Sequence, residues 1–365
     1  MGDEDLRRLQ RDAARGDVAA AARLARQQVR HGRPPAWTLA TTWPLEEAER
    51  ASDALFTPDG ADLLLVTGKA VRALDPSTGR ARGEVRPGLR RGVRCAALWE
   101  GRHAERAPGA AVQASGGALG RRLQLDVRPR AAVRAHSRPR LVLGEGRLGG
   151  PGAGGCSVVA SSLRARAAPH VLHEFSDEVD ALAAGGQLAV AACGHDARAW
   201  TGAGGAIVWR SPFVVRALAV AAQGRRVLAV GERAALVRDL TGPDELSRPA
   251  GGLVLVATAA LSHDGALAVT ATRDEVQVWD AVEGTLVRAL SCPEAPVRRV
   301  SLSPGGVLAA ALADRVRLWH VDTGLSLGVT PGLGLPVIAA TLDPTTERRL
   351  VVVSPTRVWT LARTG

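Results

Sequence analysis

The sequence predicts an all-β repeat fold, because strand-like and turn-like signals recur together with one period. Trp279, Trp319 and Trp359 stand 40 residues apart, and each ends a short run of alternating strand-forming residues. The turn signals that precede these tryptophans are Ser262–Gly265, Ser303–Gly306 and Asp343–Thr345. A period of about 40 residues with strands and turns in constant phase is typical of the blades of a β-propeller. A propeller is a scaffold for many unrelated functions, so any activity has to be argued from a site.

Residues 1–35 differ from the rest of the chain and predict a short N-terminal helical hairpin. Small and apolar residues recur there at helical spacing, with an interruption at Gly16–Asp17 and a stop at Pro34–Pro35. The apolar positions of the two expected helices are Leu6, Leu9, Ala13 and Ala14, followed by Ala21, Leu24, Ala25 and Val29. Such a thin, mostly alanine stripe is not expected to fold alone, so we expect the hairpin to dock on the rest of the chain or on a partner.

Residues 36–365 predict the propeller itself, with paired turns in every clear repeat. Thr57–Gly60 and Asp75–Gly79 combine Pro, Asp and Gly in the order that tight turns favour. The step from Pro58 to Asp75 is 17 residues, and the step from His263 to Asp280 is the same. This agreement in phase predicts that the same pair of turns is built in different blades.

The spacing of the innermost strands predicts the number of blades. These strands are expected to begin near residues 53, 93, 179, 215, 257, 297 and 337. The interval from 93 to 179 is about two periods, so we expect a further blade within 140–160 and eight blades in all. Seven is the alternative if the Gly-rich stretch 144–155 is an insertion. The last unit, 336–361, has only three strands, and the strand-like segment 37–43 is expected to supply the fourth and close the ring.

The closing residues of the repeats resemble those of the WD-repeat family. Val278–Asp280 resembles the closing dipeptide of that family, Leu318–His320 is close to it, and Thr57–Gly60 is similar to its first turn. The resemblance is strong over 51–87 and 256–361, fair over 177–253 and weak over 88–176. Arg238 stands where the family has tryptophan, and no Gly-His pair opens a repeat. The resemblance implies a propeller that acts as an interaction platform, with an incomplete version of the family's Asp-His-Ser/Thr-Trp hydrogen-bond network.

Composition places limits on partners and on compartment. The chain has no Tyr, one Lys (Lys69) and many Arg, Ala and Gly residues, a bias expected of a GC-rich bacterial genome. The acidic start, Met1–Asp5, predicts no signal peptide, and no apolar run is long enough to cross a membrane. We therefore expect a cytoplasmic protein that is monomeric, with its four scattered cysteines reduced.

No motif predicts a catalytic, cofactor or metal site. The periodic tryptophans are expected to be core residues between blades rather than a ligand-stacking face. His170–Glu174 has neither of the metalloprotease spacings and is expected to be a strand, where residues three apart point to opposite faces. Gly149–Gly155 lacks the Lys-Ser/Thr ending and the helix of a phosphate-binding loop. We expect a non-enzymatic protein without a cofactor, and an enzyme with a site at the channel mouth remains the distant alternative.

One feature points to a binding site. Between Arg80 and Arg140 the sequence has 15 Arg and four acidic residues, a net charge of +11, which equals that of the whole chain. The densest positions are Arg90, Arg91, Arg94, Arg121, Arg122, Arg128, Arg130 and Arg134. Clustered positive charge attracts acidic proteins or phosphates, so the sequence predicts a scaffold whose basic patch binds an acidic protein. Nucleic-acid or phosphate binding through 80–140 is the alternative, although only Trp99 could provide a stacking platform there.

Overall fold

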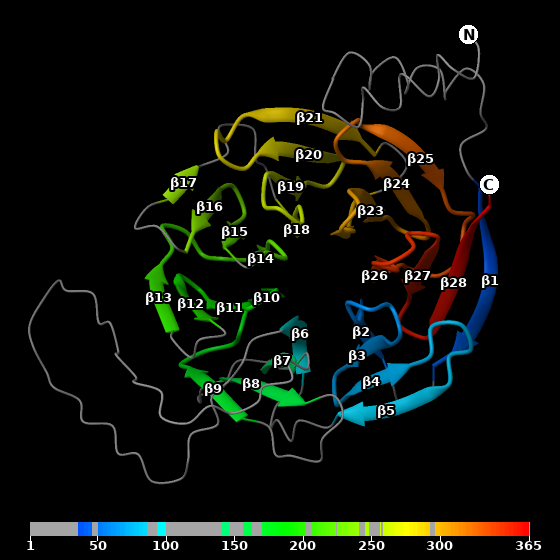
Figure 1. The fold of residues 1–365 in the computed structure, drawn as a ribbon, viewed down its shortest axis with the longest axis horizontal. Coiled ribbons are helices and arrows are strands. Elements are labelled where there is room, and N and C mark those ends of the chain that lie inside the picture. Colours follow the sequence, from blue (N-terminus) through cyan, green and yellow to red (C-terminus); the bar gives the residue numbers. More distant parts are fainter. Residues whose placement is uncertain are drawn as a thin grey trace, which may run out of the picture.

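The computed structural model describes residues 36–45, 50–85, 93–99, 140–145, 156–162, 170–201, 206–223, 225–240, 245–247, 256, 258–292 and 296–364. Within these ranges the secondary structure consists of strands, and the strands form seven four-stranded antiparallel sheets. The sheets stand side by side in a ring, as the blades of a propeller, with one strand of each sheet innermost (Figure 1). The helical hairpin expected over 1–35 lies outside the described residues.

The seven blades follow one another along the chain, each running from the innermost strand to the outermost strand. Blade 1 comprises β2 (Ala51–Phe56), β3 (Leu63–Thr67), β4 (Val71–Leu74) and β5 (Ala81–Val85). Blade 2 comprises β6 (Val93–Trp99), β7 (Arg140–Glu145), β8 (Cys156–Ser162) and β9 (His170–Phe175). Blade 3 comprises β10 (Ala181–Gly185), β11 (Leu188–Cys193), β12 (Asp196–Thr201) and β13 (Ala206–Arg210). Blade 4 comprises β14 (Ala217–Val220), β15 (Arg226–Val230), β16 (Ala235–Asp239) and β17 (Glu245–Ser247).

The remaining blades complete the ring. Blade 5 comprises β18 (Thr258–Leu261), β19 (Leu267–Ala271), β20 (Glu275–Asp280) and β21 (Leu286–Ser291). Blade 6 comprises β22 (Arg299–Leu302), β23 (Val307–Ala311), β24 (Val316–His320) and β25 (Leu325–Val329). Blade 7 comprises β26 (Ala339–Leu342), β27 (Arg349–Val353), β28 (Arg357–Thr364) and, as its outermost strand, β1 (Ala36–Pro44).

The expectation of eight blades was wrong, and the seven of the alternative are observed. The segments around 140–143 and 157–160 form no blade of their own, because they are β7 and β8 of the blade that begins with β6. β6 pairs directly with β7, although residues 100–139 separate them in the sequence. The interval of two periods therefore belongs to one sheet with a long connection between its first two strands. The Gly-rich stretch 144–155 starts within β7, and the rest of it separates β7 from β8 in the sequence.

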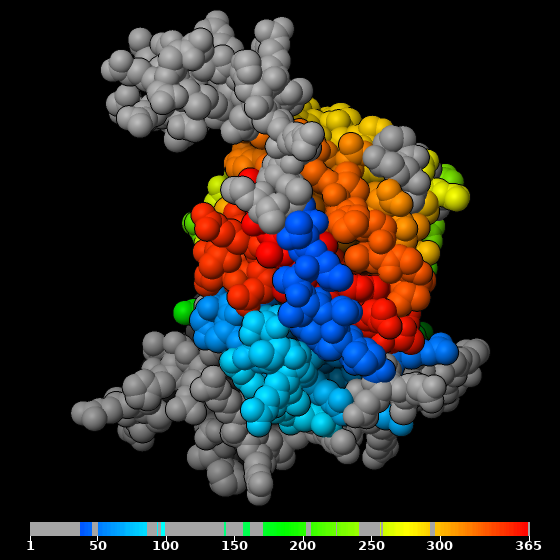
Figure 2. Space-filling view, turned by 90° about the vertical axis from the view of Figure 1, so that its right-hand side faces the viewer, coloured from blue at the N-terminus to red at the C-terminus, as the bar shows by residue number. Residues whose placement is uncertain are grey.

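The two ends of the described chain meet in blade 7. β1 pairs antiparallel with β28 from Ala36 opposite Thr364 to Pro44 opposite Arg357. Figure 2 shows β1 as a dark blue strip on the rim of the ring, beside red residues of the last blade and orange residues of blade 6. Pairing of the first strand with the last covers an edge that would otherwise expose unpaired backbone groups.

The predicted turns are confirmed, and their chemistry repeats between blades. In blade 1, Thr57 Oγ1 donates to Asp59 Oδ1 at 2.6 Å, and the equivalent donation in blade 5 runs from Ser262 Oγ to Asp264 Oδ1 at 2.7 Å. Gly60 follows at φ 68°, in the left-handed region that favours glycine. A short polar residue, an aspartate and a glycine are therefore what this turn requires locally.

A buried valine before each of several innermost strands links one blade to the preceding one. The amide of Val215 donates to the carbonyl of Gly194, and that of Val297 donates to the carbonyl of Arg273. The same link is made by Val93 to Gly68, Val256 to Glu232 and Val337 to Ala313. Seven apolar clusters, one between each pair of neighbouring blades, form the core. Packing between sheets is therefore the main cohesive force of the ring.

The tryptophans predicted to be core residues are buried, but they do not all occupy equivalent positions. Trp279 and Trp319 stand opposite Ala268 and Leu308, three residues beyond the start of the hairpin pairing in their blades. In blade 7 this position is Leu361, and Trp359 lies two residues earlier. The turn between β26 and β27 is two residues longer than its counterpart in blade 6, since Leu342 pairs with Leu350 whereas Leu302 pairs with Leu308. The equal spacing of the third tryptophan therefore hides a shift in register.

Candidate functional site

The predicted basic patch cannot be placed as a whole. Arg90, Arg91, Arg121, Arg122, Arg128, Arg130 and Arg134 lie outside the described residues. Arg94 lies on β6, but its side chain is also outside the described part. In the sequence Arg90 and Arg91 precede β6, Arg94 belongs to it, and the others stand between β6 and β7. Described residues of blades 2 and 3 form a surface at the rim where these two blades meet.

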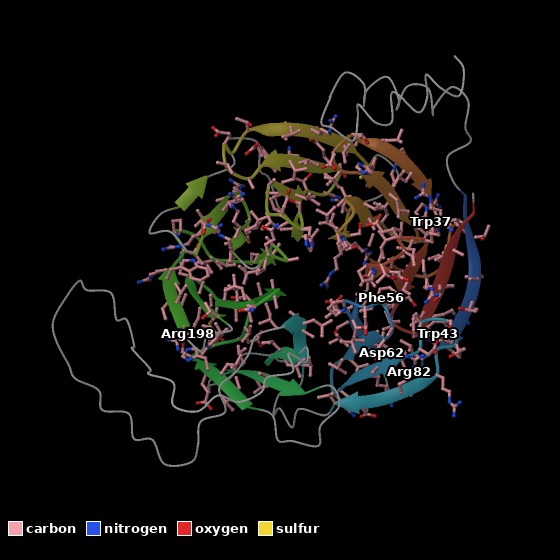
Figure 3. All side chains as sticks on the ribbon, in the orientation of Figure 1. Trp37, Trp43, Phe56, Asp62, Arg82 and Arg198 are labelled. Atoms are coloured by element: carbon pink, nitrogen blue, oxygen red, sulfur yellow. The ribbon has the colours of Figure 1, made fainter. Side chains whose placement is uncertain are left out.

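Strands β9, β12 and β13 assemble this surface, which we call the blade 2–3 rim: Leu172, His173, Arg198 and Val208. His173 stands opposite Val158, a residue of the apolar cluster between blades 2 and 3, so its side chain faces blade 3. A β-bulge at Leu172 interrupts the alternation of β9, and Leu172 packs against the same cluster. Arg198 and Val208 are direct cross-strand partners on blade 3. Figure 3 labels Arg198 at this rim.

An arginine and a histidine meet at the centre of the blade 2–3 rim. Arg198 Nη1 lies 2.9 Å from His173 Nδ1, and the ring of His173 meets that of Phe175 edge to face with centroids 4.7 Å apart. Because the guanidinium can only donate, Nδ1 has to accept, and the imidazole is neutral. Burial lowers the pKa of His173 below its ordinary value, and the charge of Arg198 lowers the pKa further. The contact is thus strongest at pH values at which the imidazole of His173 is neutral and Nδ1 is unprotonated.

Arg198 lacks an acidic partner within the described part of the chain. The ion pairs found there join other arginines to Asp or Glu, and none involves Arg198. Burial lowers the pKa of the Arg198 guanidinium, so this cation is partly desolvated without a counter-charge. Val208, its cross-strand neighbour, is 61% exposed. The rim therefore offers a partner a cation beside an aliphatic side chain.

Further polar contacts lie near the starts of the innermost strands. Arg299 of β22 donates from Nη2 to Asp53 Oδ2 of β2 at 2.5 Å, and the amide of Ala54 donates to Asp53 Oδ1 at 2.8 Å. Asp53 is only 5% exposed, and burial raises its pKa above the ordinary value although Arg299 acts in the opposite direction. Arg216 pairs more loosely with Asp180, at 3.6 Å. In each ion pair the arginine and the aspartate belong to different blades, so the pair holds two blades together. This is a structural role.

A concavity of about 430 Å³ lies beside the bulge of β1. Ser77, Thr346, Arg348 and Arg349 contribute to its lining. Two of the hydroxyls are already engaged, since Ser77 Oγ donates to Asp75 Oδ1 and Thr346 Oγ1 donates to Asp343 Oδ2. These two hydroxyls have already used their hydrogens, and the described lining contains no His, Cys, Asp or Glu, so we do not take the concavity as the candidate site.

The other sequence-predicted candidates have simple placements. His170–Glu174 lies on a strand, as predicted, although the bulge at Leu172 breaks the regular alternation on which the argument about opposite faces depended. Gly149–Gly155 lies outside the described residues. Cys156, Cys193 and Cys292 are free thiols, and no group of three or more His, Cys, Asp or Glu side chains in the described ranges is arranged to hold a metal.

Sequence reasoning did not find the blade 2–3 rim. His173 and Arg198 lie 25 residues apart on different blades. The sequence singles out His173 only as part of His170–Glu174, and Arg198 stands in no motif. The one available signal was the charged residue inside the otherwise apolar run Ala197–Trp200, because a lone arginine between buried positions of a strand needs a partner nearby.

The comparisons with known proteins add no name to this geometry. The chain matches no protein-family model, and no curated protein matches it significantly. Across the described residues there is no helix with the length and apolarity needed to cross a membrane.

Proposed function

We propose that this chain is a non-enzymatic, cytoplasmic scaffold that binds an acidic protein through blade 2 and the adjoining blade 2–3 rim. A propeller supports this proposal only in general terms, because the fold serves many functions. The specific support comes from the charge of segment 80–140 in the sequence and from Arg198 on β12 of blade 3.

The observation that carries the proposal is that Arg198 has no acidic partner among the described residues. A partly buried arginine without a carboxylate is unfavourable, and an acidic side chain from a partner would relieve this. Arginine is also among the residues enriched at the energetically important positions of protein interfaces. Val208 supplies exposed aliphatic surface directly beside Arg198. An acidic residue flanked by an apolar one is therefore the partner feature that would fit.

Membership in the WD-repeat family is part of this proposal. Its support is the donation from Trp279 Nε1 to Thr270 Oγ1 at 2.9 Å, which is the Trp–Thr part of that family's network. The turn after Trp279 adds to it, since Asp280 Oδ1 accepts the amides of Val282 and Glu283 at 2.8 and 2.9 Å. Ala310 stands in blade 6 where Thr270 stands in blade 5, so the bond cannot form with Trp319.

Charge reversal tests the proposal. Two variants would be compared with the full chain: Arg198→Glu, and a variant with Arg90, Arg91, Arg121 and Arg122 changed to Glu. The first assay measures binding to a glutamate-rich peptide. The second identifies the proteins that co-purify from the native host. Both variants should lose the peptide and the same co-purifying protein, while the melting temperature stays within a few degrees. Charges at the edge of an interface act mainly on association rate and on its salt dependence.

Arg273→Glu is the matched control, because Arg273 is exposed and lies on blade 5, away from the proposed surface. It should bind like the parent. An unchanged set of co-purifying proteins in both charge-reversed variants would refute the proposal. Tight binding of a DNA duplex by the parent, with a steep loss of affinity as salt is raised, would favour the nucleic-acid alternative instead.

A further inference from the structure

The concavity beside the bulge of β1 lies between blade 7 and blade 1. On β27, Leu350 belongs to the apolar cluster shared with blade 6, and Val351 belongs to the cluster shared with blade 1. Because side chains alternate along a strand, Arg349 faces blade 1, as Val351 does. Thr360 stands opposite Val351, and its Oγ1 donates to the carbonyl of Pro76 in the β4–β5 turn of blade 1 at 3.1 Å. The concavity, which Arg349 and Thr360 both line, is therefore an opening between two sheets.

Two arginines line this opening without an acidic partner among the described residues. Arg348 ends the turn before β27, and Arg349 begins that strand. Neither guanidinium makes an ion pair or a hydrogen bond with another residue of the described ranges. The absence of Asp and Glu from the described lining makes the concavity unsuitable for acid–base chemistry, but the same absence favours an anion.

In two other blades a charged residue at the position of Arg349 has a partner within the ring. Arg349, Arg226 and Asp62 are equivalent, because the carbonyl of each accepts the amide of the residue that follows the innermost strand of its blade. Arg226 Nη1 donates to the carbonyl of Gly265 in blade 5 at 2.9 Å. Asp62 Oδ1 accepts from Arg82 Nη1 at 3.0 Å (Figure 3). Arg349 differs from these two residues, since its charge is left for a ligand.

The acidic side chains that lie near the lining in the sequence or contact it are engaged elsewhere. Asp343 Oδ2 accepts from Thr346 Oγ1 at 3.1 Å, and Asp343 is only 4% exposed. Glu347 Oε1 accepts a backbone amide of blade 6 at 2.8 Å. Asp75 forms an ion pair with Arg82 of its own blade. These three carboxylates are therefore held by other groups and leave the two arginines to a ligand.

The free polar groups of the concavity are hydrogen-bond donors, and the rest of its wall includes apolar groups. A guanidinium has five N–H donors and no acceptor. Thr41 Oγ1, which makes no hydrogen bond with the described residues, adds a hydroxyl. Ala40 and Ala362 contribute methyl groups to the wall. The volume of about 430 Å³ lies within the range of about 300–1,000 Å³ that is typical of small-ligand sites.

We propose that this concavity binds a small phosphate monoester, with the phosphate on Arg348 and Arg349 and an apolar body against Ala40 and Ala362. Arginine binds phosphate through two parallel N–H donors, and a phosphate monoester carries a charge of about −2 at neutral pH, which matches two guanidinium groups. The site belongs to blades 7 and 1. It is independent of the proposed protein-binding surface of blades 2 and 3, so either proposal can fail without the other.

Isothermal titration calorimetry of the full chain with phenyl phosphate tests this site. The parent should bind one molecule per chain. Arg348→Gln and Arg349→Gln should each weaken binding about 10-fold or more, because each removes charge-assisted hydrogen bonds. Ala362→Leu should also weaken binding about 10-fold or more, because it fills the opening while leaving both charges in place. The melting temperature of each variant should stay within a few degrees of the parent.

Arg357→Gln is the matched control, because Arg357 is an exposed arginine at the other end of β28 from Ala362 and does not line the concavity. It removes the same charge from the same blade and should leave the affinity within about twofold of the parent. Phenol, which lacks the phosphate, should bind at least about 10-fold more weakly than phenyl phosphate.

Several outcomes would overturn the proposal. One is the absence of saturable binding by the parent up to about 10 mM phenyl phosphate. Another is an affinity that is unchanged in Arg348→Gln and Arg349→Gln, or lowered equally in Arg357→Gln, since binding would then reflect overall charge only. A phosphoserine peptide that binds more than about 10-fold more tightly than phenyl phosphate, and loses this affinity in Arg349→Gln, would assign the site to a modified protein and overturn the small ligand.

Discussion

Replacing Arg299 with methionine should expose how much the ring depends on the ion pair between blades 1 and 6. Asp53 is 5% exposed and its Oδ2 accepts from Arg299 Nη2 at 2.5 Å, while its Oδ1 accepts the amide of Ala54. Methionine keeps the aliphatic length of arginine but removes the charge. Breaking a buried pair by removing one partner is destabilising by about 3–5 kcal/mol, because the remaining charge is left uncompensated. We expect a value near 3 kcal/mol at pH 8, since the Arg299 side chain is 41% exposed and water can reach its place.

The loss should depend on pH in a defined direction. Burial already raises the pKa of Asp53 in the native protein, and removal of Arg299 raises this pKa further. The native variant then binds a proton more tightly than the unfolded chain does, so its free energy of unfolding decreases as pH rises from the unfolded pKa, about 4, through the native pKa. The slope within this window is at most about 1.4 kcal/mol per pH unit for one group. The variant should therefore be closer to the parent at pH 5 than at pH 8.

Urea denaturation at pH 5 and pH 8, at equal ionic strength, measures both effects. Arg299→Lys keeps a cation and should lose less, and the double variant Asp53→Asn/Arg299→Met removes the buried charge and should recover much of the stability at pH 8. If Arg299→Met is as stable as the parent at pH 8, or loses the same amount at both pH values, the buried carboxylate is not controlled by Arg299 and the reasoning fails.

Other substitutions and deletions test the packing and the closure. Trp319→Ala removes a side chain that is 4% exposed and should lower the free energy of unfolding by about 3–5 kcal/mol, measured by urea denaturation. A loss below about 1 kcal/mol would place Trp319 outside the packed core. Thr270→Val leaves the buried Nε1 of Trp279 without its acceptor and should cost about 1–3 kcal/mol, whereas Thr270→Ser should retain most of the stability. Deleting 1–45 removes β1 and should cause aggregation by opening blade 7, while deleting 1–32 should leave a folded ring; equal melting curves for the two deletions would contradict the closing role of β1.

Short-range signals in the sequence were sufficient for the repeat. The Pro-Asp-Gly and Asp-x-x-x-Gly turns depend on the backbone preferences and side-chain hydrogen bonds of a few consecutive residues. Their phase therefore indicated where the innermost strands begin, within a few residues of β2, β6, β10, β14, β18, β22 and β26. Burial of Trp279 and Trp319 followed from the same period. The turns are local features, so sequence alone determines them. The burial of the two tryptophans was inferred from the period that the turns set.

The count of blades and the positions of several side chains were decided by tertiary structure. Pairing of β6 with β7 across residues 100–139 is a long-range contact, and no local signal separates a long connection from a hidden blade. The shifted register of Trp359 results from a turn two residues longer between β26 and β27, which spacing in the sequence conceals. The contacts of Arg198 with His173 and of Arg299 with Asp53 join different blades, and in the second case they join residues 246 positions apart. Such pairs form only when the closed ring brings the strands together, because each partner alone sits in an ordinary strand.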